Sequence, residues 1–311
     1  MRVDARLELA GTGPGPAAPP PAREHNALSL SPSSGYAATQ HQIRSRGALD
    51  IAFQSQNGPT RLARSFQSGC LRLRVPRAES ASEIPTAVVI NTAGGIAGGD
   101  ALNQSFRWDE GARAIVTTQA AEKVYRALAG GPAARIDTTL HVRAGAHAEW
   151  LPQEAILFDS SVLRREARVL LDAQATFLGM EALILGREAM GETVRAGHLS
   201  DRLRIWRDGR LVYADALVLD GEIDRLMRRA SIGQGMRAMA IIVHAAPDAP
   251  ALLPAVRAAL AEPSGCAAAS AWNGLLAVRL LAPDGEALRR DIASAFAVLR
   301  EGRPLPRVWR C

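Results

Sequence analysis

The sequence predicts a mainly β protein (α+β), built from stacked or sandwiched β-sheets with about two α-helices packed in the C-terminal third. Apolar and polar residues alternate over much of residues 43–216, and turn residues separate the alternating runs. The clear helical stripes come only in the last third. Many short strands separated by turns are typical of a β-sandwich and not of βαβ units.

Residues 1–40 differ in composition from the rest of the chain. Gly11–Ala22 and Ser29–Gly35 consist almost entirely of proline, glycine, alanine and serine. Such segments bury too little apolar surface to offset the entropy of ordering them. We therefore expect a disordered tail over 1–40 and a single domain over 41–311, β-rich over 41–235 and with an α/β layer over 236–311.

The strands are expected first where one face is apolar. Alternation is clearest in four runs: Leu49, Ile51 and Phe53; Leu71, Leu73 and Val75; Ile136, Thr138, Leu140 and Val142; and Leu203 and Ile205. Shorter β-prone runs are Thr86–Ile90, Ala114–Thr118 and Arg210–Ala216. Glycine-containing turns such as Asp208–Gly209 and Asp220–Gly221 separate them.

The last third mixes strands and helices. The expected strands are Met236–Ala245, Ala267–Trp272 and Leu275–Leu281, the last two joined by an Asn273–Gly274 turn. The expected helices are Asp248–Leu260, a final helix with Asp284 as N-cap and a stripe of Leu288, Ile292, Ala295, Phe296 and Leu299, and a weaker one over Glu222–Ala230. Gly302 and Pro304 end the final helix.

Composition excludes several classes of protein. The 311 residues are 48% hydrophobic and 22% charged, and no apolar run approaches the length of a membrane helix. The N-terminus lacks the apolar region of a secretory signal. Three distant cysteines, Cys70, Cys266 and Cys311, do not suggest a disulfide framework and favour a reducing cytoplasm.

The positive charge is not typical of nucleic-acid binding. The net charge is +6, but the basic residues are scattered and are almost all arginine, because Lys123 is the only lysine. A nucleic-acid site normally shows a clustered basic patch, so we expect no nucleic-acid partner. Lys123 either supplies a compact ammonium group needed there or is there by chance.

The glycine-rich segment Ala93–Asp100 resembles a phosphate loop only superficially. Its glycines occur as two pairs, Gly94–Gly95 and Gly98–Gly99, no Lys-Ser/Thr follows, and Asp100 would repel phosphate. The following residues are strand-like, so no helix N-terminus is available for an anion. We expect a tight double turn that needs positive φ angles or close backbone approach.

Metal and catalytic motifs are absent from the sequence. His141 and His147 flank a turn at Ala144–Gly145 and would face each other across a hairpin, but two ligands do not make a tight metal site. No G-x-S-x-G motif occurs. Paired carboxylates, Glu154 with Asp159 or Glu181 with Glu192, leave open the alternative of a β-rich carbohydrate hydrolase.

Four segments taken together resemble the UreD (also called UreH) family of urease accessory proteins. They are Gly94–Asp100 (GGIAGGD), Thr117–Arg126 (TTQAAEKVYR), Trp150–Asp159 (WLPQEAILFD) and Gly179–Glu192 (GMEALILGREAMGE). They occur in the family's order and cover about residues 45–220 well, and the C-terminal third more loosely. The chain departs from the family pattern at Cys70, at Asn91–Ala93 and at Glu122.

The resemblance implies a scaffold that is not an enzyme. Members of the family bind the urease apoprotein and, with UreF and the GTPase UreG, help deliver nickel to its active site. It implies a β-rich fold with two helices, transient passage of nickel with no tightly bound cofactor, and no membrane partner. The implied docking or nickel-path candidates are Gly94, Gly95, Gly98, Gly99, Asp100, Thr117, Thr118, Lys123, Tyr125, Arg126, Trp150, Glu154, Asp159, Glu181, Arg187 and Glu192.

Overall fold

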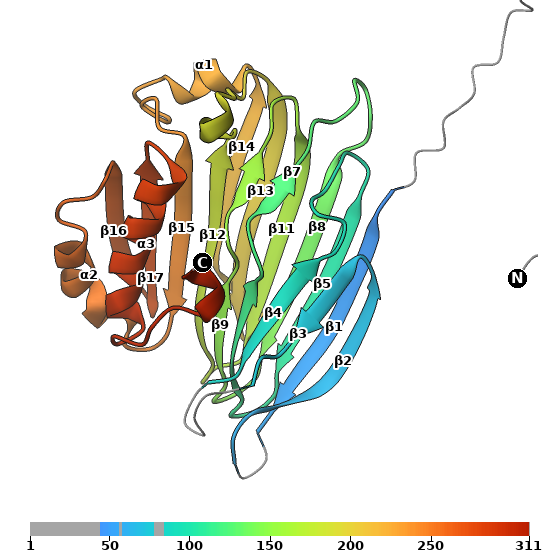
Figure 1. Cartoon of the computed structure of the whole chain (residues 1–311). Coiled ribbons are helices and arrows are strands. Elements are labelled where there is room, and N and C mark those ends of the chain that lie inside the picture. Colours follow the sequence, from blue (N-terminus) through green and yellow to red (C-terminus); the bar gives the residue numbers. More distant parts are fainter. Residues whose placement is uncertain (1–43, 56–57, 78–83, 311) are drawn as a thin grey trace, which may run out of the picture. The chain divides into compact units, whose positions relative to one another are not determined.

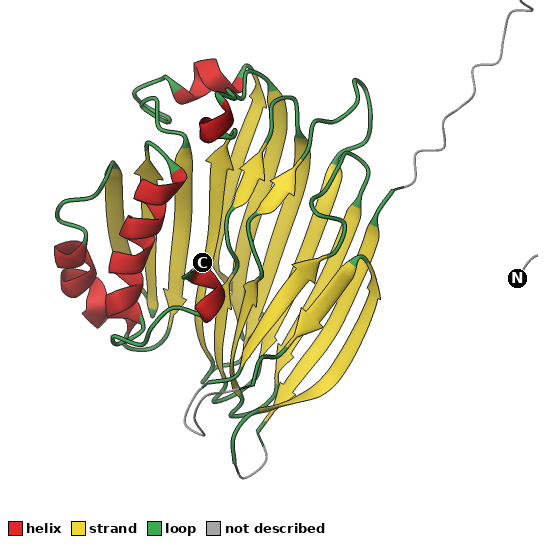
Figure 2. Ribbon diagram, in the orientation of Figure 1, coloured by secondary structure: helices red, strands yellow, loops and turns green. Residues whose placement is uncertain are grey.

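Two β-sheets make up most of the computed structural model, which describes residues 44–55, 58–77 and 84–310 (Figures 1 and 2). Sheet A contains, in spatial order, β14 (Arg210–Gly221), β13 (Gly197–Arg207), β11 (Val162–Leu171), β8 (Ala134–Val142), β5 (Ala101–Trp108), β1 (Arg46–Gln54) and β2 (Arg61–Gly69). Sheet B contains β16 (Cys266–Trp272), β17 (Leu275–Ala282), β15 (Ala238–Ala245), β12 (Thr176–Leu185), β9 (His147–Leu151), β6 (Arg113–Thr118), β4 (Thr86–Asn91) and β3 (Leu71–Arg74). Two short strands, β7 (Glu122–Val124) and β10 (Ala155–Leu157), pair with each other, and β10 also pairs with β12. The prediction of a mainly β protein is confirmed, while the expected tail over 1–40 lies outside the described residues.

The chain alternates between the two sheets from β4 to β13. Strands β4, β6, β9 and β12 lie in sheet B, and the strands between them, β5, β8, β11 and β13, lie in sheet A. Successive strands within each sheet are parallel. Parallel neighbours need a long crossover connection, usually a helix. Here a strand of the opposite sheet supplies it, which explains parallel pairing without βαβ units.

The main apolar core lies between the sheets. Phe106, Trp108 and Phe177 are fully buried there, and the Phe106 and Trp150 rings lie 5.5 Å apart. Inward side chains are apolar and outward ones polar in strands such as β8 and β11, as the period of two predicts.

A second apolar core lies on the outer face of sheet B. Helix α3 (Gly285–Leu299) packs there through the predicted stripe, and the Asp284 carboxylate caps it by accepting from the Ala287 N–H at 2.7 Å. The helix expected over Asp248–Leu260 is instead split into the 3₁₀ turn η2 (Ala249–Leu252) and α2 (Leu253–Ala259). Pro254 has no N–H to donate within the first turn of α2.

The remaining elements are short. Helix α1 (Ile223–Met227) is shorter than the expected Glu222–Ala230, and two 3₁₀ turns are η1 (Glu188–Met190) and η3 (Arg307–Trp309). Strand β2 was not predicted, because RLARSFQSG is largely exposed along its length and has no apolar face. In the described ranges, no helix has both the length and the apolar character to cross a membrane.

Candidate functional site

The glycine turn folds against the Tyr125 side chain. Gly94, Gly95 and Gly99 have φ angles of 75°, 149° and 88°. A Cβ on Gly95 would lie 2.5 Å from the Tyr125 ring, and the Tyr125 hydroxyl donates to the Gly94 carbonyl at 2.8 Å. Gly98 has an ordinary φ, but a Cβ there would lie 2.9 Å from the Pro132 carbonyl. The prediction of a double turn that needs positive φ or close approach is confirmed.

Residues of the other motifs gather around Tyr125. Its ring meets Phe158 edge-on at 5.2 Å, and the Arg187 guanidinium lies 4.0 Å from the centroid of the Phe158 ring. Arg187 Nε donates to Glu192 at 2.8 Å, and this hydrogen bond is the main cause of the lowered pKa of Glu192. Glu192 also accepts from the Asp159 N–H at 3.2 Å. We call this region, residues 94–99, 122–128, 158–161 and 186–196, the motif end.

The Asp159 carboxylate joins two of these loops. It accepts from the N–H groups of Arg195 at 2.8 Å and Ala196 at 3.1 Å and lies 3.4 Å from Arg126 Nη2. Burial by itself would raise the pKa of Asp159, but the two backbone hydrogen bonds and Arg126 lower it. Asp159 is therefore a structural anion that holds the loops together.

A cavity of about 300 Å³ lies behind the motif end, with residues of both sheets in its lining. Gly94, Gly95, Thr118 and Lys123 contribute to this lining. Glu122 lies in it too, and Asn91 Nδ2 donates to both of its carboxylate oxygens at 3.1 and 3.2 Å. Two departures from the family pattern are thus in contact with each other.

The Glu122 carboxylate is held in a partly buried place. Burial raises its pKa to about 7, with a smaller contribution from the charge of Asp100, although the hydrogen bond from Asn91 opposes the shift. Asp100 itself accepts from the Ser45 N–H at 2.7 Å and the Ala97 N–H at 2.8 Å. Near neutral pH, Glu122 therefore exchanges a proton readily.

Arg165, Glu181 and Asp201 form a buried ion cluster deeper between the sheets. Arg165 Nη1 lies 2.7 Å from Glu181, and Arg165 Nη2 and Nε lie 2.6 and 2.9 Å from the Asp201 oxygens. Trp150 Nε1 donates to Glu181 at 3.1 Å. Burial raises the pKa of Glu181, and the Asp201 charge adds to this effect, whereas Arg165 and Trp150 oppose it.

The ion cluster lies between two cavities. Glu181 lines the cavity behind the motif end and also a second, mainly apolar cavity of about 470 Å³, while Arg165 lines only the first and Asp201 only the second. Carboxylate and amide oxygens in these linings could attract a divalent cation. No cluster of three or more His, Cys, Asp or Glu side chains in the described residues could hold a metal.

Other predicted residues have packing roles. Thr117 is fully buried and donates to the Leu151 carbonyl at 2.6 Å, and Thr118 Oγ1 accepts from the Gln153 N–H at 2.8 Å. Glu154 pairs with Arg289 of α3 at 2.8 Å. The four carboxylates considered for a hydrolase, Glu154, Asp159, Glu181 and Glu192, each contact an arginine of their own.

The expectation that His141 and His147 face each other across a hairpin is wrong. His141 lies on β8 of sheet A and His147 on β9 of sheet B, because the chain crosses between the sheets at Ala144–Gly145. His147 instead lies 2.8 Å from Thr176 Oγ1 through Nδ1 and 3.3 Å from Glu149 through Nε2.

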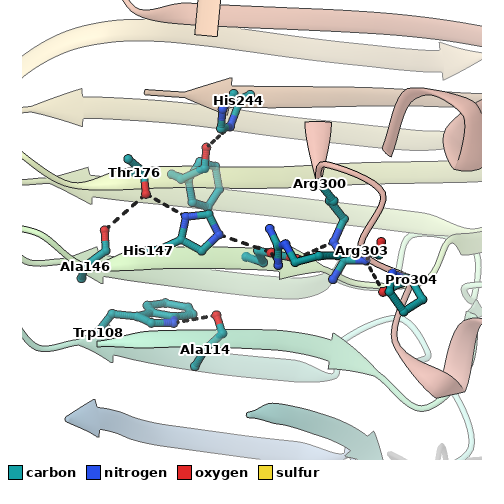
Figure 3. A network of polar contacts seen from close by, with 11 residues as sticks. Trp108, Ala114, Ala146, His147, Thr176, His244, Arg300, Arg303 and Pro304 are labelled. Atoms are coloured by element: carbon teal, nitrogen blue, oxygen red, sulfur yellow. Dashed lines mark hydrogen bonds and ion pairs between the residues drawn. The ribbon is translucent and has the colours of Figure 1, made fainter. Parts of the chain in front are cut away.

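Glu149 is the centre of a second buried ion cluster, shown in Figure 3. It is fully buried and binds Arg300 Nε at 2.8 Å and Arg303 Nη1 at 2.6 Å. Burial by itself would raise its pKa, but the His147 hydrogen bond and the charges of both arginines lower it to about 2. Sequence reasoning missed this cluster, although Glu149 shares its strand face with Leu151, which α3 and the C-terminal segment cover.

Sequence reasoning also missed Arg165 and Asp201. Both lie on the apolar face of their strands, Arg165 between Leu163 and Ala167, and Asp201 between Leu199 and Leu203. A charge in an apolar stripe needs a partner. That interruption of the alternating pattern was the signal that could have found them.

Comparison with known proteins agrees with the motifs. A family model described as UreD urease accessory protein matches residues 45–310. The chain is 48% identical over 266 residues to the urease accessory protein UreD of Xanthobacter autotrophicus, covering 86% of this chain and 90% of that protein. It is 44% identical over 273 residues to the UreD of Azorhizobium caulinodans, covering 88% and 99%. The chain belongs to the UreD family of urease accessory proteins.

Proposed function

We propose that the chain is a cytoplasmic scaffold in urease maturation. In this role it binds the urease apoprotein together with UreF and the GTPase UreG, supports nickel insertion as a chaperone, and has no turnover of its own. Family membership supports the accessory role. The contacts of the candidate residues support the finer assignment, as follows.

The surface of the motif end suits a protein partner. Leu128 and Met190 are 59% and 73% exposed, and they lie among the charged side chains of Lys123, Arg126 and Arg187. Exposed apolar side chains within a charged rim are typical of interaction surfaces. Several loops bonded to one another hold this surface in shape, which reduces the entropy cost of docking.

The cavity behind the motif end suits transient passage of nickel. Glu122 and Glu181 offer carboxylate oxygens there, and Asn91, Gln104 and Thr118 add neutral oxygens. A metal ligand must be deprotonated, so a proton competes with the metal at a carboxylate whose pKa is about 7. Weak, exchangeable binding is what a path requires. Glu122, in contact with Asn91 at the motif-end side of the cavity, is the observation on which this proposal depends.

Reconstitution of urease from purified apoprotein, UreF, UreG, nickel and GTP tests the proposal. We expect that omitting the chain abolishes activation, and that Glu122→Gln lowers the recovered activity severalfold while complex formation is retained. Glu110→Gln, an exposed carboxylate in a turn, is the matched control.

A second variant separates docking from passage. Leu128→Glu with Met190→Glu should reduce co-purification with UreF and apo-urease, because two charges replace exposed apolar contacts. Activation as complete without the chain as with it would overturn the proposal, as would carbohydrate hydrolysis by the chain alone that is lost in Glu154→Gln.

A further inference from the structure

A groove of about 760 Å³ lies along the C-terminal segment of the domain, away from the motif end. Its walls are residues 300–310 on one side and the residues that follow β3 and precede β4 on the other. Five arginines line it: Arg77, Arg300, Arg303, Arg307 and Arg310. The described lining contains no aspartate or glutamate.

Apolar side chains make up the rest of the groove. Val88 and Ile115, each 5% exposed, lie on the outer face of sheet B, and Val308 lines the groove beside them. Prolines at 76, 85, 304 and 306 also line the groove and have no N–H to offer a ligand. Recognition in this groove would therefore use guanidinium groups together with aliphatic contacts.

The C-terminal wall is fixed in place. Glu149 holds Arg300 and Arg303, Gln153 Nε2 donates to the Val308 carbonyl at 3.2 Å, and Trp309 Nε1 donates to Thr117 Oγ1 at 3.2 Å (Figure 3). Glu149 can compensate only one of the five positive charges. Arg77 and Arg310 are exposed. A rigid wall with excess positive charge is preorganised for an anionic partner.

We infer that this groove docks an acidic peptide segment of a partner protein, with aliphatic side chains between its carboxylates. Guanidinium groups bind carboxylates in bidentate pairs, and arginine clusters recognise acidic motifs. Nucleic acid would match the charge but has no aliphatic side chains for Val88, Ile115 and Val308. The inference rests on the proposed function only in expecting a protein partner.

A direct binding measurement tests it. The probe is a fluorescently labelled synthetic peptide of alternating glutamate and leucine, followed by fluorescence anisotropy with the full-length chain. We expect Arg77→Glu with Arg310→Glu to weaken binding about tenfold or more, and salt to weaken it in the wild type. Arg61→Glu with Arg210→Glu, two exposed arginines on sheet A, makes the same change in net charge and should leave binding unchanged.

Several outcomes would overturn the inference. Equal weakening by both double variants would show non-specific charge attraction, and tight binding of a peptide with glutamine in place of glutamate would remove the role of the arginines. Displacement of the peptide by a single-stranded oligonucleotide that binds more tightly would assign the groove to nucleic acid. Binding seen only after Glu79→Gln with Glu83→Gln would make the chain's own acidic residues the occupant. Activation of urease by a wild-type chain that does not bind the peptide would overturn this inference and leave the proposed function intact.

Discussion

The space between the sheets and the outer face of sheet B each bury a three-residue ion cluster, and the two clusters have opposite composition. Between the sheets one arginine, Arg165, is shared by two carboxylates, whereas on the outer face one carboxylate, Glu149, is shared by two arginines. The pKa of Glu181 is raised in the first cluster, mainly by burial, and that of Glu149 is lowered in the second. Excess positive charge makes a buried carboxylate a permanent anion that holds the structure together, and excess negative charge leaves one that readily takes up a cation or a proton.

Removing the shared arginine gives the largest expected effect. Arg165→Met leaves Glu181 and Asp201 buried without a cation, so we expect the free energy of unfolding to fall by about 4 kcal/mol in denaturant titrations near neutral pH. Arg164→Met, on the exposed face of the same strand, should change it by less than about 0.5 kcal/mol. A loss below about 1 kcal/mol for Arg165→Met would mean that the carboxylates are already neutral.

Removing the shared carboxylate comes next. Glu149→Gln leaves Arg300 and Arg303 without their anion, and we expect a loss of about 3 kcal/mol. The wild type should lose this stability as pH falls from about 4.5 through about 2, because the folded pKa lies below the unfolded one. Glu286→Gln, which removes an exposed helix-surface pair with Arg290, should cost less than about 0.5 kcal/mol. An acid transition that is identical in wild type and Glu149→Gln would contradict the comparison.

Glu122 extends the comparison to the cavity. Its pKa is raised to about 7, so the stability it contributes is complete below about pH 4.5 and is lost as pH rises through 7. We expect Glu122→Gln to remove a dependence of about 2 kcal/mol from the unfolding free energy over this range. Unfolding curves at several pH values measure it, with Glu110→Gln as the control. A flat wild-type profile would show that Glu122 is solvated.

The smallest effect distinguishes the two clusters most sharply. Glu181→Gln leaves the balanced pair Arg165–Asp201, so we expect the unfolding free energy to change by less than about 1 kcal/mol, in contrast with Glu149→Gln. The same variant should lower nickel-dependent activation of urease. A loss of stability as large as that of Glu149→Gln, with activation unchanged, would make the cluster between the sheets purely structural.

The candidate site could be predicted only in part. The glycine pairs, Tyr125, Asp159, Arg187 and Glu192 come from recognisable motifs, and the structure brings them together at the motif end. Arg165 and Glu149 belong to no motif quoted above, and their partners are distant in sequence. The Glu149–Arg300 pair spans 151 residues and the Arg165–Asp201 pair 36. The hairpin expected for His141 and His147 failed for a related reason, since a turn signal does not say whether the chain returns to the same sheet.

The sequence by itself determined the local structure of this protein. Alternating apolar residues specified strands and their buried faces, Asp284 and the stripe that follows it specified α3, and paired glycines specified a turn with positive φ angles. Only the tertiary structure decided which strands are neighbours and which sheet each one joins. A period of two fixes the face of a strand that is buried, but any apolar face can cover another. The ion clusters, the cavities and the arginine groove depend on that choice, because each is built from side chains that the sheets bring together.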